Sequence, residues 1–172
     1  MTAHAPLALH PDRLFPPEPT QRAIARRLYG QIAGLPIISP HGHTDPAWFA
    51  TDAPFENATE LLLVPDHYVF RMLHSQGVDL DALGIPRADG SRAAVDPRAA
   101  WHLLAERFYL FRGTPSALWL DHVFFEVFGL RVRLSKATAD LYYDSITDAL
   151  ATPAFRPRAL FERFGIEVIA TT

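Results

Sequence analysis

The sequence predicts a mostly helical α/β protein in which a long run of helices separates two parallel strands. A short apolar run at residues 36–39 is ended by a proline, and a second apolar run occupies residues 166–171. Short runs of this kind, bounded by proline or glycine, are typical of buried strands. Between them, apolar residues recur mainly at helical spacing. Two strands joined by such a crossover are expected to pair in parallel.

The composition is that of an ordinary folded protein, and it argues against several functional classes. The chain has 172 residues, 49% of them hydrophobic, and a net charge of −3, so no nucleic acid or other polyanion is expected as a partner. It contains no cysteine, which excludes disulfides and thiolate metal sites. No apolar run approaches the roughly 20 residues of a membrane span, and residues 1–6 lack the pattern of a secretory signal. We therefore expect a cytoplasmic protein without membrane contact, and the composition leaves a homo-oligomer open.

An arm, a helix and the first strand are expected before residue 44. The density of proline in residues 1–19 forbids a regular helix and predicts an extended arm, which leucines such as Leu7 and Leu14 attach to the body. Thr20 is placed to cap a helix over about 21–33, and Gly34 is placed to end it. Apolar residues four apart give this helix one apolar face: Ile24, Leu28 and Ile32. The first strand and the motif after it are predicted over 36–43.

Residues 46–165 are predicted to form a helical insertion whose helices begin at capping residues. Asn57 is placed to cap a turn over 58–63, and Asp66 to cap a helix to about residue 76. Asp96 and Thr114 each precede a proline, which fits the first turn of a helix. Further helices are expected over about 97–111, 115–128, 135–149 and 157–165, with a loop at 77–95 and the second strand at 166–171.

The helix over 115–128 is apolar on nearly all sides, so burial between neighbouring elements is expected. His122 lies within it. A histidine in such a setting can be a hydrogen-bonded core residue or a ligand. We expect the core role here.

His41 and His43 follow the first predicted strand as a His-Gly-His motif. Side chains at positions i and i+2 of an extended segment point to the same side, so the two imidazoles can converge on one metal ion. Imidazole is a usual ligand of zinc and similar divalent metals. The carboxyl end of a strand is where α/β enzymes place their sites. The alternative is a polar strand end without a ligand.

His67, Arg71 and His74 fall on one face of the helix predicted from Asp66, with Tyr68 at the edge of that face. Such a face can be plain solvated surface. It can also bind an anionic, hydroxyl-rich ligand, because the arginine guanidinium pairs with carboxylates in bidentate geometry.

Two strands are too few for a stable sheet, and a catalytic metal site usually has three protein ligands. Here two good ligand candidates are found, and a complete (β/α)8 barrel needs about 250 residues. These observations predict the amino-terminal part of a larger enzyme, whose isolated fragment is inactive. The alternative is a self-sufficient, mostly helical domain.

Three stretches carry a resemblance to a known family. They are residues 41–43 (HGH), residues 66–72 (DHYVFRM) with 75–78 (SQGV), and residues 119–122 (WLDH) running to 127–129 (VFG). Together they resemble the uronate (glucuronate) isomerases, a branch of the amidohydrolase superfamily. In this resemblance, residues 119–122 correspond to a buried Trp helix and residues 167–172 (EVIATT) to the second barrel strand. The likeness extends from about Leu7 to the end, and the Asp-His-Tyr-x-x-Arg segment is its most specific part.

The resemblance implies a distorted (β/α)8 TIM barrel with a large helical insertion between the first two strands. It implies isomerisation of D-glucuronate to D-fructuronate and of D-galacturonate to D-tagaturonate. His41 and His43 would be the metal ligands, with zinc as the expected divalent metal. His67 and Tyr68 would contact the uronate substrate and take part in catalysis, and Arg71 would support the substrate carboxylate or the helix.

This sequence departs from the family at two places. Gly42 stands where many members have cysteine, a change expected to leave metal binding intact. Residues 44–46 (TDP) replace a commoner apolar residue, so the loop there is expected to differ. Two rival functions stay open on sequence grounds: a metal-dependent hydrolase, because a His-x-His motif also serves a metal that activates water, and a non-catalytic helical binding module.

Overall fold

The computed structural model describes residues 4–171, and this part of the chain divides into two compact units. The first unit comprises residues 4–8 and 55–152, and the second comprises residues 9–54 and 153–171. The second unit contains both strands, and the first unit contains most of the helices. Among the described residues, no helix is long and apolar enough to cross a membrane.

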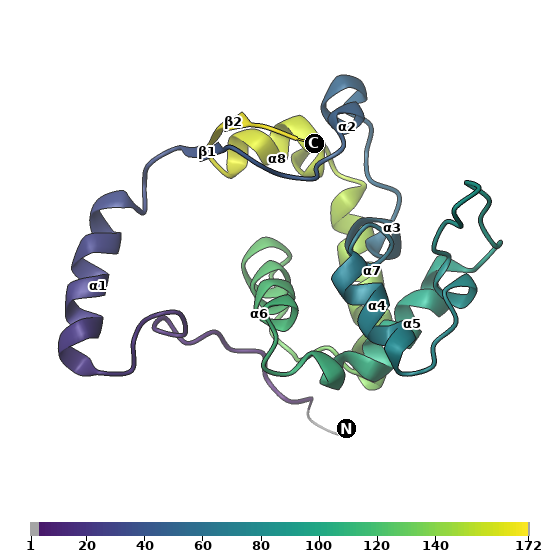
Figure 1. Ribbon diagram of the computed structural model, residues 1–172, viewed down its shortest axis with the longest axis horizontal. Coiled ribbons are helices and arrows are strands. Elements are labelled where there is room, and N and C mark those ends of the chain that lie inside the picture. Colours follow the sequence, from purple (N-terminus) through teal and green to yellow (C-terminus); the bar gives the residue numbers. More distant parts are fainter. Residues whose placement is uncertain (1–3, 172) are drawn as a thin grey trace. The chain divides into compact units, whose positions relative to one another are not determined.

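The second unit is built around a two-stranded parallel sheet. Strand β1 (Ile37–Ser39) pairs with β2 (Ile166–Ile169), with Ile38 opposite Val168 and Ser39 opposite Ile169. Helix α8 (Pro157–Arg163) contacts β2, as Figure 1 shows, and α2 (Pro46–Thr51) contacts α8. Both strands and their parallel pairing are confirmed. Helices α2 to α8 all lie between them in the sequence.

The predicted burial of β1 is wrong for this chain. Ile37 is 48% exposed and Ile38 is 63% exposed. The reason is that the described residues form a sheet of two strands, so one neighbour and one helix cannot cover both faces.

Helix α1 (Pro19–Ile32) is present, but its cap differs from the prediction. The Glu18 carboxylate, rather than Thr20, accepts hydrogen bonds from the amides of Thr20 and Gln21. Those two bonds lower the pKa of Glu18, since both stabilise the ionised form. The helix ends at Ile32 with Ala33 as its C-cap, before Gly34, and its apolar face is exposed.

The first unit packs short helices around an aromatic core. Its helices are α3 (Ala58–Leu62), α4 (His67–Ser75), α5 (Pro97–Arg107), α6 (Pro115–His122) and α7 (Ala139–Leu150). Asn57, Asp66, Asp96 and Thr114 all cap the helices that follow them, which confirms these four predicted starts. Each cap side chain accepts an amide hydrogen bond that the first turn leaves unpaired.

The core of this unit is centred on Trp101, Phe124 and Tyr142, all fully buried. The Phe124 and Tyr142 rings pack edge to face with their centroids 4.9 Å apart, a favourable arrangement for aromatic pairs. The Trp101 indole N–H donates to the carbonyl of Ala139 at 3.1 Å, so its polar atom is satisfied in the core. Burial also raises the pKa of Tyr142.

Residues 4–8 of the amino-terminal arm belong to this unit. Pro6 forms an antiparallel bridge with Val132, the amide of Leu7 donates to the carbonyl of Arg131, and the Leu7 side chain is buried. No helix occurs in residues 4–18. The predicted attachment by Leu14 is wrong, since Leu14 is 69% exposed.

Other predictions in this unit need correction. Helix α5 stops at Arg107 and continues as a 3₁₀ turn, Phe108–Phe111, and α6 stops at His122 before a π-helical turn, Val123–Val127. Trp119, expected to be buried, is 47% exposed, and His122, expected in the core, is exposed. Leu120 and Phe124 take the buried positions instead. The loop predicted at 77–95 contains one 3₁₀ turn, Asp81–Leu83.

Candidate functional site

The motif with His41 and His43 leaves the carboxyl end of β1, in the second unit. The amide of Ala170, just beyond β2, donates to the carbonyl of Ser39 at 2.8 Å, so the pairing of the two strands continues to the start of the motif. The centroids of the two imidazole rings lie 5.0 Å apart, and the ring planes are nearly perpendicular at 89°. The i, i+2 spacing therefore does bring the two rings together.

This ring spacing fits two imidazoles on one metal ion. With Zn–N bonds of about 2.0–2.1 Å and a tetrahedral angle, two ligating imidazoles have centroids about 5 Å apart. Neutral imidazole nitrogens are a fitting donor set for zinc. Among residues 4–171, no group of three or more His, Cys, Asp or Glu side chains is arranged to hold a metal. The described residues thus bring two imidazoles together at the carboxyl end of β1, one fewer than the three protein ligands usual for a catalytic metal site.

Gly42 lies close to the residue after β2, and one hydrogen bond joins the loop after the motif to Thr171. A Cβ atom at Gly42 would meet the carbonyl oxygen of Ala170 at 3.4 Å, an ordinary contact, so this position does not require glycine for space. The Thr171 hydroxyl donates to the carbonyl of Thr44. The His-x-His loop therefore runs directly beside the carboxyl end of the second strand.

Helix α2 follows the motif and is held by Arg158 of α8. Asp45 caps α2 through the amide of Ala47 at 2.8 Å. At the other end, the Arg158 guanidinium donates to the carbonyls of Phe49 and Ala50, at 2.8 and 3.1 Å. The Arg158 amide donates to Asp52, a non-glycine residue with a φ of 51°. No sequence signal connects residue 158 with residue 52, so the sequence analysis missed this anchor.

The predicted substrate-contacting residues lie on α4, in the first unit. The Asp66 carboxylate accepts from the amides of Tyr68 and Val69, which starts the helix and places His67 and Tyr68 in its first turn. Their ring centroids are 4.2 Å apart, and Tyr68 is 68% exposed.

Arg71 lies one turn further along α4. It is exposed and has no ion pair within the described part of the chain. Val69 and Leu73 are fully buried on the opposite side, so this helix packs its apolar face into the core of the first unit. His74 is also exposed, but its Nδ1 lies 3.0 Å from the carbonyl of Val78, a contact within its own helix end.

Comparison with known proteins places the chain in a family. Residues 20–172 match the family model described as Glucuronate isomerase. The uronate isomerase of Xanthomonas euvesicatoria pv. vesicatoria is 79% identical over 166 residues, which cover 96% of this chain and 35% of that protein. The uronate isomerase of Sphingopyxis alaskensis is 71% identical over 167 residues, covering 97% of this chain and 34% of its own length.

Solved structures agree with this match. The crystal structure of glucuronate isomerase from Caulobacter crescentus is similar with a TM-score of 0.93 and 62% identity, covering 96% of this chain and 34% of that chain. The uronate isomerase from Thermotoga maritima is similar with a TM-score of 0.79 and 26% identity, covering 95% of this chain and 33% of that chain. The chain spans about a third of the length of these relatives. It belongs to the glucuronate isomerase family.

Proposed function

We propose that this chain supplies the first two strands and two metal ligands of a (β/α)8 aldose–ketose isomerase that acts on hexuronates. The substrates proposed are D-glucuronate, converted to D-fructuronate, and D-galacturonate, converted to D-tagaturonate. One observation carries the proposal. Within a chain of the glucuronate isomerase family, the rings of His41 and His43 lie 5.0 Å apart at the carboxyl end of β1, where α/β enzymes place their sites.

His41 and His43 would hold a divalent metal, for which zinc is proposed because imidazole nitrogen is its usual ligand. When bound, such an ion polarises a carbonyl or hydroxyl oxygen of the sugar. The protein's contribution is to keep both rings in place. The hydrogen bonds from Ala170 to Ser39 and from Thr171 to Thr44 support that role, because they tie the residues on both sides of the motif to the segment after β2.

The isomerisation moves one hydrogen from C2 to C1 and one from the C2 hydroxyl to the C1 oxygen, so it needs no external oxidant or reductant. It does need groups that accept and return protons. Tyr68 is proposed to donate a hydrogen bond to a sugar oxygen or pass a proton to it, and His67 to contact the substrate beside it. Arg71 is proposed to pair with the sugar carboxylate. The exposure of all three side chains on α4 supports these roles.

The test is an isomerase assay on the complete natural reading frame that contains this sequence, because the chain spans about a third of its relatives. Conversion of D-glucuronate to D-fructuronate, lost on chelation and restored by zinc, is the expected result. The 172-residue chain alone is expected to be inactive. Hydrolysis of simple esters or amides without uronate isomerisation would contradict the proposal in favour of a metal-dependent hydrolase. Absence of both activities would favour a binding module.

A further inference from the structure

A pocket in the first unit has a mixed apolar and charged lining, and it lies outside the site discussed above. Its volume is about 590 Å³, within the usual range for small-molecule sites. It is formed by the 3₁₀ turn after α5, the first two turns of α6, and the segment before α7. None of its lining residues is a proposed metal ligand or substrate contact. They are Phe108, Tyr109, Arg112, Gly113, Thr114, Pro115, Ala117, Leu118, Asp121, Arg133 and Leu134.

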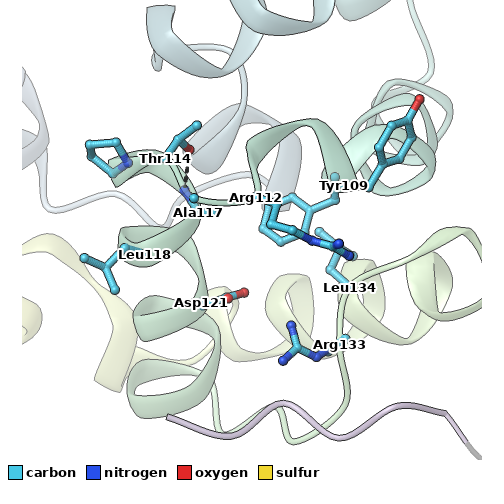
Figure 2. A pocket seen from close by; sticks show the side chains of 11 residues that line it. Tyr109, Arg112, Thr114, Ala117, Leu118, Asp121, Arg133 and Leu134 are labelled. Atoms are coloured by element: carbon cyan, nitrogen blue, oxygen red, sulfur yellow. Dashed lines mark hydrogen bonds between the residues drawn. The ribbon is translucent and has the colours of Figure 1, made fainter. Parts of the chain in front are cut away.

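The apolar part of this lining suits a flat hydrocarbon body. Phe108, Leu118 and Leu134 come from three different segments of the chain and contribute aromatic and aliphatic surface to one cavity. Leu134 is buried and Leu118 is 38% exposed; both side chains are labelled in Figure 2. Burial of apolar area favours binding, so a ligand with an aromatic ring is expected to bind this lining most tightly.

Three charged side chains add polar recognition: Arg112, Asp121 and Arg133, all labelled in Figure 2. Among residues 4–171, none of these three side chains makes a hydrogen bond or a direct ion pair, and Arg133 acts on Asp121 only through its charge. Two cations and one anion leave one positive charge at the pocket, which favours a monoanion. A dianion is disfavoured, since Asp121 would repel it.

Asp121 is the least solvated of these charges. Burial raises its pKa, and the nearby Arg133 opposes that rise. A half-buried carboxylate without a donor gains most from a ligand hydroxyl, because the hydrogen bond replaces the lost hydration.

We propose that this pocket binds a small aromatic monocarboxylate that carries a hydroxyl group. Arg112 and Arg133 receive the ligand carboxylate, Asp121 accepts the hydrogen bond of the hydroxyl, and Phe108, Leu118 and Leu134 pack against the ring. Guanidinium groups suit a carboxylate because they present two parallel donors. The helix start at Thr114 is not part of this recognition, because its hydroxyl is engaged with the Phe111 carbonyl and the Ala117 amide.

The experiment titrates the 172-residue chain with 4-hydroxybenzoate and follows the amide resonances by NMR. Saturable binding with a Kd below about 1 mM is expected, with the largest shifts confined to residues 108–121 and 133–134. Shifts spread evenly over the chain, or no saturation, would overturn the proposal. This footprint needs no variant, so it stands even where a substitution disturbs folding.

Two charge variants then test the carboxylate contacts. Arg112→Gln and Arg133→Gln are each expected to weaken binding at least about tenfold, the loss of roughly one charge-assisted hydrogen bond. Arg87→Gln is the matched control. Arg87 is an exposed arginine of the same unit outside the pocket, paired with Asp81. Equal affinity in all three variants and the parent chain would overturn the assignment.

The hydroxyl contact and the ligand class are tested by comparing the effect of one substitution on two ligands, one with and one without the hydroxyl. Asp121→Asn is expected to weaken the binding of 4-hydroxybenzoate several-fold, because a charge-assisted hydrogen bond becomes a neutral one. The same variant is expected to bind benzoate more tightly. Benzoate lacks the hydroxyl, so in the parent chain the Asp121 carboxylate only repels it. Parallel changes for both compounds, or tighter binding of phenyl phosphate than of 4-hydroxybenzoate to the parent chain, would refute the proposed class. None of these outcomes depends on isomerase activity.

Discussion

Trp101 and Trp119 have the same side chain in opposite environments, which makes them a matched pair for stability. Trp101 is fully buried and donates to Ala139, whereas Trp119 is 47% exposed. Trp101→Ala is expected to destabilise the chain by about 3–5 kcal/mol, the usual cost of an aromatic core truncation. Trp119→Ala should cost about 1 kcal/mol or less. Urea unfolding of both variants checks this, and equal losses would contradict the described core.

Tyr68 is the residue on which proposed proton transfer depends most directly. Tyr68→Phe keeps the ring and the helix but removes the hydroxyl. In the complete enzyme, it is expected to lower turnover of D-glucuronate at least about a hundredfold, the low end for a general acid–base group. His41→Ala should cause a similar loss together with loss of bound metal. The control is Tyr29→Phe, because Tyr29 is exposed to a comparable degree at 55%. Full activity in Tyr68→Phe would refute its role.

At the scale of the element, Arg158 links α8 to α2, the helix that follows the His-Gly-His motif. Its guanidinium holds the carbonyls of Phe49 and Ala50, and lysine cannot reproduce this two-point contact. Arg158→Lys is therefore expected to speed amide hydrogen exchange in α2 about tenfold, which corresponds to one lost hydrogen bond.

The control for this change is Arg156→Lys, because Arg156 lies at the start of α8, the helix that also contains Arg158. Arg156 is exposed, and its side chain makes no hydrogen bond among the described residues. If both variants leave exchange in α2 unchanged, the anchor has no role in ordering that helix.

Helices α5 and α7 are linked by a surface ion-pair cluster that makes their contact depend on pH. His102 and Arg98 of α5 each lie 2.9 Å from Asp140 of α7. The hydrogen bond with His102, and then that with Arg98, lowers the pKa of Asp140 below its usual 3.8. A carboxyl group whose pKa is lower in the folded chain stabilises the fold when the pH is above the ordinary pKa of that group. This stabilisation is lost as the pH falls through the lowered pKa.

Asp140→Asn removes this contribution. When the pH is lowered from about 5 to about 2, the melting temperature of the variant should therefore fall less than that of the parent chain. The difference is expected to be small and to shrink with added salt, since the cluster is exposed. Asp148→Asn, at an exposed position of the same helix, is the control. A parent-like fall in Asp140→Asn would contradict the role of the cluster.

At the scale of the whole molecule, the two units differ in how much they bury. Helices α5 and α7 of the first unit contain fully buried residues, whereas α1 of the second unit has none. Amide exchange in the 172-residue chain is therefore expected to be fastest in α1 and slowest in α5 and α7, because local stability follows buried apolar contacts. Uniform protection across both units would contradict this difference.

The sequence alone determined the features that depend on neighbouring residues. Asn57, Asp66, Asp96 and Thr114 start helices because a cap acts within three residues of itself. His41 and His43 lie close together because they are only two residues apart in the chain, and Val69 and Leu73 share one face of α4 because they are about one helical turn apart. The family could be inferred for the same reason, since its motifs are short and contiguous.

Only the tertiary structure decided which apolar residues are buried and which distant residues meet. Trp101 rather than Trp119 enters the core, and Arg158 reaches Phe49 across more than a hundred positions. Pocket residues from 108 to 134 likewise converge only after folding. The physical reason is that burial and long-range hydrogen bonds depend on how elements pack, and the periodicity of a single element shows which face is apolar without showing what covers it.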